Sequence, residues 1–234
     1  MLDRWVEVSP HVPYLAPFMT FLLLMALGQF FEGPQHLPWL YAVRTFGSLG
    51  VALAFWRYWP PLGKPHVLWA VVFGVAVAAM WVYVHKWFAG FDWYRTTQIL
   101  GKDAQPADFY NPFEHFANTW ALGLFLFVRI GGAAIVVPIV EEIFWRGFLL
   151  RLFVNHWEFD KVPLGTFTLR SFVIVSLLSA AEHPMWEVGI LCWMVYNALF
   201  YWKKSLMFLI VTHGITNLVL YVYVVIAKDW VFWS

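Results

Sequence analysis

The sequence predicts an all-α, polytopic membrane helix bundle with seven or eight transmembrane helices and an intramembrane polar site. Of its 234 residues, 62% are hydrophobic and only 12% are charged, and the mean hydropathy is +0.66. Soluble domains carry about 25% charged residues. Apolar runs of about 20 residues, the length that crosses a bilayer as a helix, recur along the chain. These observations predict an integral membrane protein with a single membrane domain, residues 1–234.

The first part of this domain, residues 1–115, is predicted to contain three membrane helices and an interfacial loop. The predicted helices are Val12–Phe31, Leu37–Trp59 and Val67–Phe88. The first of them carries no charge and lacks the basic flank and cleavage site of a signal peptide, so it is predicted to be retained. Residues 89–115 are polar and rich in aromatic side chains, including Asp92, Asp103 and Asp108. This composition predicts a connection that lies at the membrane interface.

The second part of the chain, from residue 116 onwards, contains the polar residues that lie at membrane depth. An apolar helix is expected from Phe116 to about Phe153, but Pro138 lies inside it. A proline can kink or end a helix, so residues 116–153 form either one bent helix or two. The remaining predicted helices are Ser171–His183, Glu187–Trp202 and Ser205–Ala227, and Pro184 divides the first two.

The most informative motif is Glu-Glu-x-x-x-Arg at residues 141–146. Each charge at a bilayer centre costs about 2.5–3.5 kcal/mol on insertion scales, so these side chains must face a protein interior or a wet cavity. Glu142 and Arg146 have the spacing of a same-face ion pair. Glu141 lies about 100° further round the helix and is left to act as a general base. The alternative is a purely structural ion pair between helices.

A second pair of polar residues, His213 and Asn217, lies four residues apart on one face of the last predicted helix. An imidazole and an amide in this position are able to donate hydrogen bonds to a developing oxyanion. The alternative is that they join helices, at about 0.6 kcal/mol for each hydrogen bond.

A third candidate is His183, which precedes Pro184 at a predicted helix end and is able to reach a water molecule there. Glu182 either orients this histidine or lies at the membrane interface. A structural role for His183 is the alternative. Among the remaining charges, Arg129 is expected to be buried and to pair with Glu182 or another acid.

Together these groups supply a base, histidines and an amide, which suit the activation of water and the stabilisation of a tetrahedral intermediate. Neither a Gly-x-Ser-x-Gly nor a His-Glu-x-x-His motif is present. We therefore favour metal-free hydrolysis without a cofactor, and a zinc ion held by Glu141, His183 and His213 is the alternative. The single cysteine, Cys192, excludes an intramolecular disulfide, and the net charge of +1 does not imply nucleic acid as a partner.

The three motifs together resemble the CAAX prenyl protease family, the type II CAAX endopeptidases or CPBP intramembrane proteases. The family pattern is Glu-Glu-x-x-x-Arg, then Phe-x-x-x-His, then His-x-x-x-Asn or Asp, each on its own helix. The second motif departs from it, since Ser179 stands where the family has phenylalanine. The chain is also similar to a bacterial group associated with exosortase systems. This closer similarity rests on Val137-Pro138, residues 159–165, His183-Pro184 and residues 230–233.

The resemblance implies a metal-independent, glutamate-dependent intramembrane endopeptidase that cuts near the C-terminus of a membrane-associated or lipidated substrate. It makes residues 116–220 the catalytic core. Glu141 with His183 would activate water, His213 with Asn217 would bind the oxyanion, and Glu142 with Arg146 would hold the architecture. The implied surroundings are a bacterial inner membrane, with exosortase-system proteins as partners. A non-enzymatic scaffold or sorting partner and a zinc-dependent membrane protease remain the alternatives.

Overall fold

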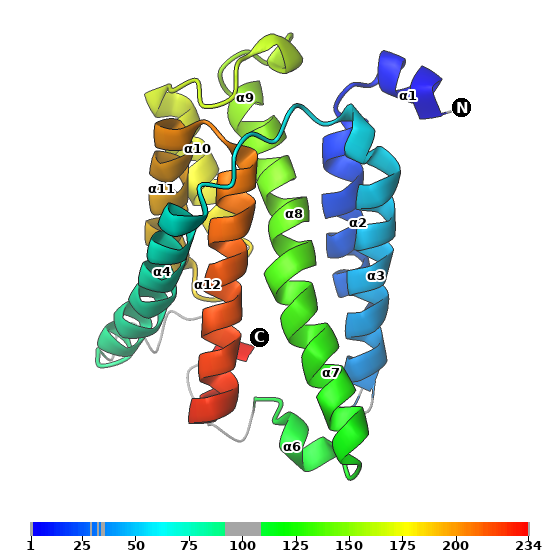
Figure 1. Ribbon diagram of the computed structural model, residues 1–234, viewed down its shortest axis with the longest axis vertical. Helices are drawn as coiled ribbons and strands as arrows, with labels where there is room; N and C mark the ends of the chain where they lie inside the picture. Colours follow the sequence, from blue (N-terminus) through cyan, green and yellow to red (C-terminus); the bar gives the residue numbers. More distant parts are fainter. Residues whose placement is uncertain (1, 29, 32, 34–35, 92–108, 234) are drawn as a thin grey trace.

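The computed structural model describes residues 2–28, 30, 31, 33, 36–91 and 109–233, which form an elongated bundle of helices (Figure 1). Its longer elements are α2 Val12–Gly28, α3 Leu37–Phe55, α4 Val67–Phe88, α10 Leu169–Ala180, α11 Trp186–Lys203 and α12 Leu206–Ala227, together with the segment Thr119–Leu152. Short helices are α1 Leu2–Val8 and α6 Pro112–His115. The all-α prediction is confirmed for this part of the chain.

Three of these helices are long and apolar enough to cross a membrane, namely Val67–Phe88, Thr119–Leu152 and Leu206–Ala227. Val12–Gly28 and Leu169–Ala180 are apolar but shorter. These helices are those of an integral membrane protein, as predicted, although a total of seven or eight spans is not confirmed. The acidic residues of the predicted interfacial loop, Asp92, Asp103 and Asp108, lie outside the described residues.

Residues 116–153 contain one continuous helical segment, not two helices. The segment consists of α7 Thr119–Gly131, α8 Val137–Glu142 and α9 Leu150–Leu152, joined by π-helical turns at Gly132–Val136 and Ile143–Leu149. The first turn explains why Pro138 does not end the helix. The N–H of Val137 donates to the Gly132 carbonyl in the wider i→i+5 pattern. The α-helical hydrogen-bond pattern is therefore already interrupted before Pro138, which has no N–H of its own to donate. Such turns often occur at functional sites.

The close approach of α12 to this segment depends on Gly214. A Cβ atom at this position would fall on the carbonyl oxygen of Ala134. That carbonyl lies four residues before Pro138 and therefore lacks its usual α-helical donor. The backbone of α12 can approach the backbone at Ala134 closely because Gly214 has no side chain.

We expect Gly214→Ala to destabilise the protein by about 1–3 kcal/mol, because overpacking forces neighbouring backbone to move. Gly123→Ala is the matched control, since a Cβ at Gly123 meets nothing within 4 Å. The control should be neutral or stabilising by up to about 1 kcal/mol, because alanine favours helix. Thermal unfolding of both variants in detergent measures the difference, and equal unfolding temperatures would contradict the assigned contact.

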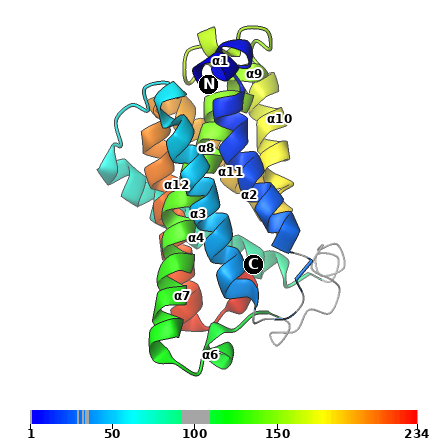
Figure 2. The ribbon, with the colours of Figure 1, turned by 90° about the vertical axis from the view of Figure 1, so that its right-hand side faces the viewer.

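The hairpin of α10 and α11 penetrates only part of the bundle. Helix α10 has 12 residues and is therefore about 18 Å long, short of the roughly 30 Å of a hydrocarbon core. Both views place this hairpin beside α9, in one half of the bundle (Figures 1 and 2). The turn between the two helices, residues 181–185, therefore meets the long helical segment within the bundle, where Trp145 donates to Glu182.

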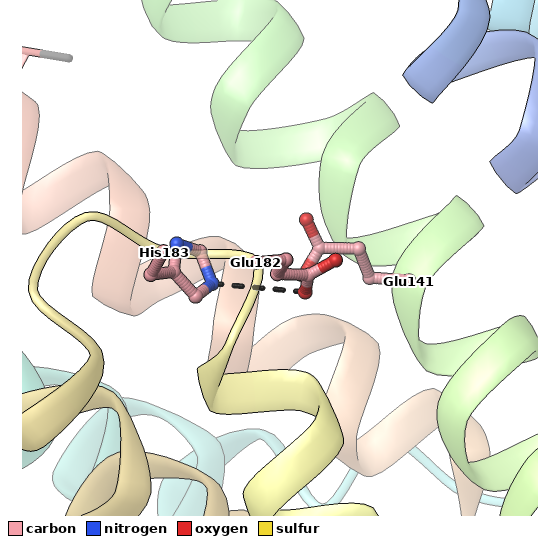
Figure 3. A group of neighbouring side chains, drawn as sticks. All are labelled: Glu141, Glu182 and His183. Carbon is pink, nitrogen blue, oxygen red and sulfur yellow. Dashed lines mark ion pairs between the residues drawn. The ribbon is translucent and has the colours of Figure 1, made fainter. Parts of the chain in front are cut away.

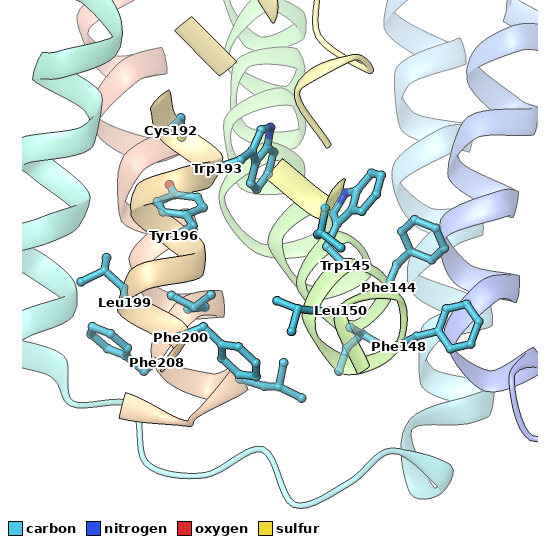
Figure 4. Packing of buried hydrophobic residues seen from close by; sticks show 14 of the residues in the cluster. Phe144, Trp145, Phe148, Leu150, Cys192, Trp193, Tyr196, Leu199, Phe200 and Phe208 are labelled. Atoms are coloured by element: carbon cyan, nitrogen blue, oxygen red, sulfur yellow. The ribbon is translucent and has the colours of Figure 1, made fainter. Parts of the chain in front are cut away.

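Aromatic packing holds the second π-helical turn in place (Figure 4). Phe144 stacks on Phe18 of α2 with ring centroids 4.1 Å apart, and Phe148 stacks on Tyr14 at 5.9 Å. Trp193 of α11 is also fully buried in this cluster. Such aromatic contacts contribute about 0.5–1.5 kcal/mol each beyond the buried area. The polar side chains of residues 141–146 are therefore held on a rigid support.

Candidate active site

A cavity of about 320 Å³ lies inside the bundle and is lined by side chains from α2, α3, α4, α11, α12, the α10–α11 turn and the long helical segment. Its volume is typical of a ligand pocket. Four predicted site residues, Glu141, His183, His213 and Asn217, line this cavity, and so does Glu182. The other two predicted residues, Glu142 and Arg146, are fully buried. Glu142 contacts His213 from within the protein, and Arg146 contacts Glu142.

The predicted ion pair between Glu142 and Arg146 is present. Arg146 Nη1 lies 3.2 Å from Glu142 Oε2, and both side chains are 0% exposed. Arg146 Nε also donates to Asn197 Oδ1 at 2.9 Å, and its guanidinium lies 4.7 Å from the ring centre of Trp193. The charge of Arg146 is thus neutralised by Glu142 and supported by an amide and an indole.

Glu142 has a second partner that the motif spacing did not suggest. Its Oε1 atom lies 3.0 Å from His213 Nδ1, so the carboxylate lies between a guanidinium and an imidazole. A carboxylate in this position orients the ring and selects its tautomer. When Nδ1–H donates to Glu142, Nε2 is the nitrogen left for a ligand in the cavity.

Glu141, Glu182 and His183 form a separate cluster on the cavity wall (Figure 3). One potential ligand atom from each lies within 4.8 Å of the others. His183 Nε2 is 3.7 Å from Glu182 Oε1, and Trp145 Nε1 donates to the same oxygen at 3.1 Å. Glu141 Oε2 is buried without a hydrogen-bond partner.

The electrostatics of this cluster favour a shared proton. The nearby Arg146 is already paired with Glu142, so among the described residues no buried cation forms an ion pair with Glu141 or Glu182. Two carboxylates this close in a buried site repel each other, and the pair is more stable with one of them protonated. A cluster of one carboxylate, one carboxylic acid and an imidazole can both accept and deliver a proton.

The ring of His183 is fixed by two indoles. Trp81 makes an edge-to-face contact with it at 5.7 Å, and Trp193 lies nearly parallel to it at 5.6 Å. Trp193 also contacts the ring of His213 at 5.5 Å. The indole of Trp193 therefore contacts both imidazoles, and His213 is paired with Glu142 and not with Glu141.

Asn217 connects α12 to the first π-helical turn. Its Nδ2 atom donates to the carbonyl oxygen of Ala133 at 2.8 Å. An amide nitrogen carries two hydrogens, so the second remains for a ligand in the cavity. Ser179, which replaces the phenylalanine of the family pattern, is fully buried and donates to the Val175 carbonyl within its own helix.

The structure adds three residues to the predicted set, Glu182, Trp193 and Asn197. Glu182 had a weak signal, since it adjoins His183, but its distance from Glu141 depends on the depth of the α10–α11 turn. Asn197 could have been found from the sequence as a lone amide in an apolar predicted helix. In the structure it also donates to Ser176 Oγ at 2.9 Å. Trp193 had none, because tryptophan is common throughout this chain.

The expectation that Arg129 pairs with Glu182 or another acid is wrong. Among the described residues its guanidinium has no acidic partner, and it donates instead to the carbonyl oxygen of Trp233. It also lies 4.2 Å from the ring centre of Tyr41. The backbone turn Trp230–Trp233 folds back towards α7 and brings this carbonyl to it.

A comparison with protein families found a match over the segment that contains these residues. Residues 119–219 match the family model described as type II CAAX prenyl endopeptidase Rce1-like. The match supports a CAAX-type protease. It begins with α7 and extends just beyond Asn217, so it contains every predicted site residue, although it covers slightly less than half of the chain. No curated protein and no solved structure matched the chain.

Proposed function

We propose that this protein is an intramembrane endopeptidase that hydrolyses a peptide bond near the C-terminus of a membrane-associated or lipidated substrate. The observation that carries the proposal is the carboxylate of Glu141, which lines the cavity beside His183 and has a buried oxygen without a protein partner. The match to type II CAAX prenyl endopeptidases over the same segment supports the reaction class.

In the proposed reaction, Glu141 and His183 hold a water molecule against the scissile carbonyl carbon. Glu141 accepts a proton from the water as its oxygen bonds to that carbon. The carbonyl oxygen becomes an oxyanion, and the second amide hydrogen of Asn217 stabilises it. The C–N bond then breaks as the proton held by the Glu141–Glu182 pair passes to the leaving amine.

The proposed oxyanion role of His213 requires a particular protonation state. Because Nδ1–H donates to Glu142, a neutral ring presents Nε2 without a hydrogen. Nε2 donates to an oxyanion only when it also carries a hydrogen, and the Glu142 carboxylate keeps the ring oriented for this, as a carboxylate does for a catalytic histidine in other hydrolases. Arg146 then holds Glu142 in place from the opposite side.

We expect Glu182→Gln to lower kcat by about 10- to 100-fold, because glutamine cannot share a proton with Glu141. Glutamine still offers an oxygen to Trp145 Nε1, so the local fold is kept. Glu182→Ala removes both the shared proton and the hydrogen bond from Trp145. Comparison of the two variants therefore separates proton transfer from positioning. If Glu182→Gln is fully active and only Glu182→Ala is impaired, Glu182 positions the turn and takes no part in proton transfer.

A zinc-dependent protease is the second candidate, because Glu141, Glu182 and His183 gather ligand atoms within 4.8 Å of one another. Glu182 takes the place of His213, which was named as a zinc ligand from the sequence. Carboxylate and imidazole are both common zinc ligands. Under the metal-free proposal, protein purified without added metal should contain less than one zinc per ten chains and keep its activity in EDTA. Stoichiometric zinc, with activity lost on chelation and restored by zinc alone, would favour the metalloprotease.

The same proposal extends to the surroundings of the enzyme. We propose that it lies in a bacterial inner membrane, that the longer helices of Figure 1 all pass through or into the bilayer, and that it belongs with the exosortase-associated group. The exosortase-group assignment is supported by Val137-Pro138, residues 159–165, His183-Pro184 and residues 230–233 alone. A search for proteins that co-purify with the inactive Glu141 variant described below would test the partner.

A further inference from the structure

Two arginines line the cavity in addition to the catalytic groups. Arg44 comes from α3 and Arg129 from α7, and both guanidiniums rest on the ring of Tyr41, with centroid distances of 4.6 and 4.2 Å. The hydroxyl of Tyr41 donates to the carbonyl oxygen of Arg129 at 3.1 Å. Tyr41 therefore joins the two helices and holds the two cations on one part of the cavity wall.

Neither arginine has an acidic partner within the part of the chain that the structure describes. The Nε atoms of both are buried without a hydrogen-bond partner, and Arg129 is only 9% exposed. The other two buried arginines have a counter-charge or backbone acceptors, although Arg146 Nη2 is also without a hydrogen-bond partner. Arg146 pairs with Glu142, and Arg151 donates to three backbone carbonyls.

Arg129 is buried and Arg44 beside it is half-buried. Cations held away from water are unfavourable without a counter-charge, and the described residues supply none. An anion that reaches both of them through the cavity would remove this cost. A carboxylate matches the fork of a guanidinium geometrically and forms charge-assisted hydrogen bonds with it. The wall formed by Arg44, Arg129 and Tyr41 therefore has the composition of a carboxylate-binding site.

The position of the two arginines favours a peptide over a lipid as the source of this anion. Arg44 lies seven residues after the start of α3 and Arg129 ten after the start of α7, which places them about 10–15 Å along their helices. Lipid phosphates remain at the membrane surface. In addition, Arg129 Nη2 already binds an oxygen of a peptide backbone, the carbonyl of Trp233.

We propose that Arg44 and Arg129 bind the terminal carboxylate of the peptide substrate, an inference that rests on the proposed endopeptidase function. Arg129 and Glu141 lie twelve residues apart on one helical segment, or about 18 Å along its axis. An extended peptide covers about 3.3–3.6 Å per residue. The site therefore measures the distance from the carboxylate to the scissile bond, which lies no more than about five residues from the end of the substrate.

Binding of two peptides to the full-length protein in phosphatidylcholine nanodiscs tests this site. Both are N-acetylated hexapeptides of alternating leucine and alanine, one with a free C-terminal carboxylate and the other with a carboxamide. The wild type should bind the carboxylate peptide about tenfold more tightly or better, as expected for hydrogen bonds to a charged group. Arg44→Gln should bind both peptides equally, whereas Arg44→Lys should keep part of the preference.

Arg57→Gln is the matched control, because it also removes an arginine from the N-terminal part of the chain. The side chain of Arg57 is 55% exposed and pairs with Asp3. It should bind both peptides as the wild type does. Equal affinity of the wild type for the two peptides would overturn the proposal, and so would a carboxylate preference that Arg44→Gln retains. Phosphatidylglycerol that co-purifies with the wild type but not with Arg44→Gln, together with equal peptide affinities, would assign the arginines to lipid phosphate and also overturn it.

Cleavage of the same peptides, followed by mass spectrometry, separates this inference from the proposed function. Carboxylate-selective binding without cleavage would support the binding site and count against the endopeptidase. Cleavage of both peptides with equal kcat/KM would support the endopeptidase and contradict the carboxylate site.

Discussion

Replacing Glu141 with glutamine should reduce peptide-bond hydrolysis by at least about 10²–10⁴-fold, the contribution typical of a positioned general base. Glutamine has nearly the same shape but cannot accept the proton of the attacking water. The fold should be unaffected, because among the described residues no hydrogen bond or ion pair of the Glu141 side chain would be lost. Hydrolysis should therefore be lost without a loss of stability.

This result is measured as kcat/KM in liposomes, with thermal unfolding of the same preparation as the test of folding. Glu158→Gln is the control, since Glu158 is exposed and pairs with Lys161 on the loop before α10. An active Glu141→Gln enzyme would remove Glu141 from the reaction. If the wild type cleaves no peptide while its binding function survives in Glu141→Gln, the non-enzymatic scaffold becomes the better interpretation.

The largest effect on stability is expected for Glu142→Gln, at about 3–5 kcal/mol, which is the usual cost of removing one partner from a buried ion pair. The substitution leaves the Arg146 guanidinium at 0% exposure without a counter-charge. It also weakens the bond to His213 Nδ1, so the orientation of that ring is lost together with stability. Activity and unfolding temperature should fall together in this variant, in contrast to Glu141→Gln.

A double variant distinguishes the ion pair from a general packing defect. Glu142→Leu with Arg146→Met removes both charges at similar volume, which is often nearly neutral in a protein interior. Its unfolding temperature should therefore exceed that of Glu142→Gln, while its activity stays low because His213 loses its carboxylate. Additive destabilisation in the double variant would show that the two side chains do not act as a pair.

The spacing of residues along single helices was sufficient to predict several features. Helix Val67–Phe88 has the predicted limits, and the pairing of Glu142 with Arg146 follows from four-residue spacing. The separation of Glu141 from that pair follows from the same helical period. These features are local, because backbone hydrogen bonds fix the positions of residues within one helix.

Features that involve two helices could not be predicted in this way. Pro138 looked like a possible helix end, but the π-helical turn before it and the packing of Gly214 on Ala134 accommodate it. Glu182 reaches Glu141 only because α10 is short and its turn enters the bundle. Arg129 was expected to pair with an acid, yet the backbone of residues 230–233 takes that place.

Hydropathy and helical period were enough to identify a helical membrane protein with buried acids, imidazoles and an amide, since both depend only on the order of residues. Tertiary structure alone decided how these groups are paired: His213 with Glu142, and Glu141 with Glu182 and His183. The physical reason is that contacts between helices depend on their depth, rotation and closest approach. Single glycines, turns and bulky aromatic side chains set these quantities, and their effect appears only when all the helices are packed together.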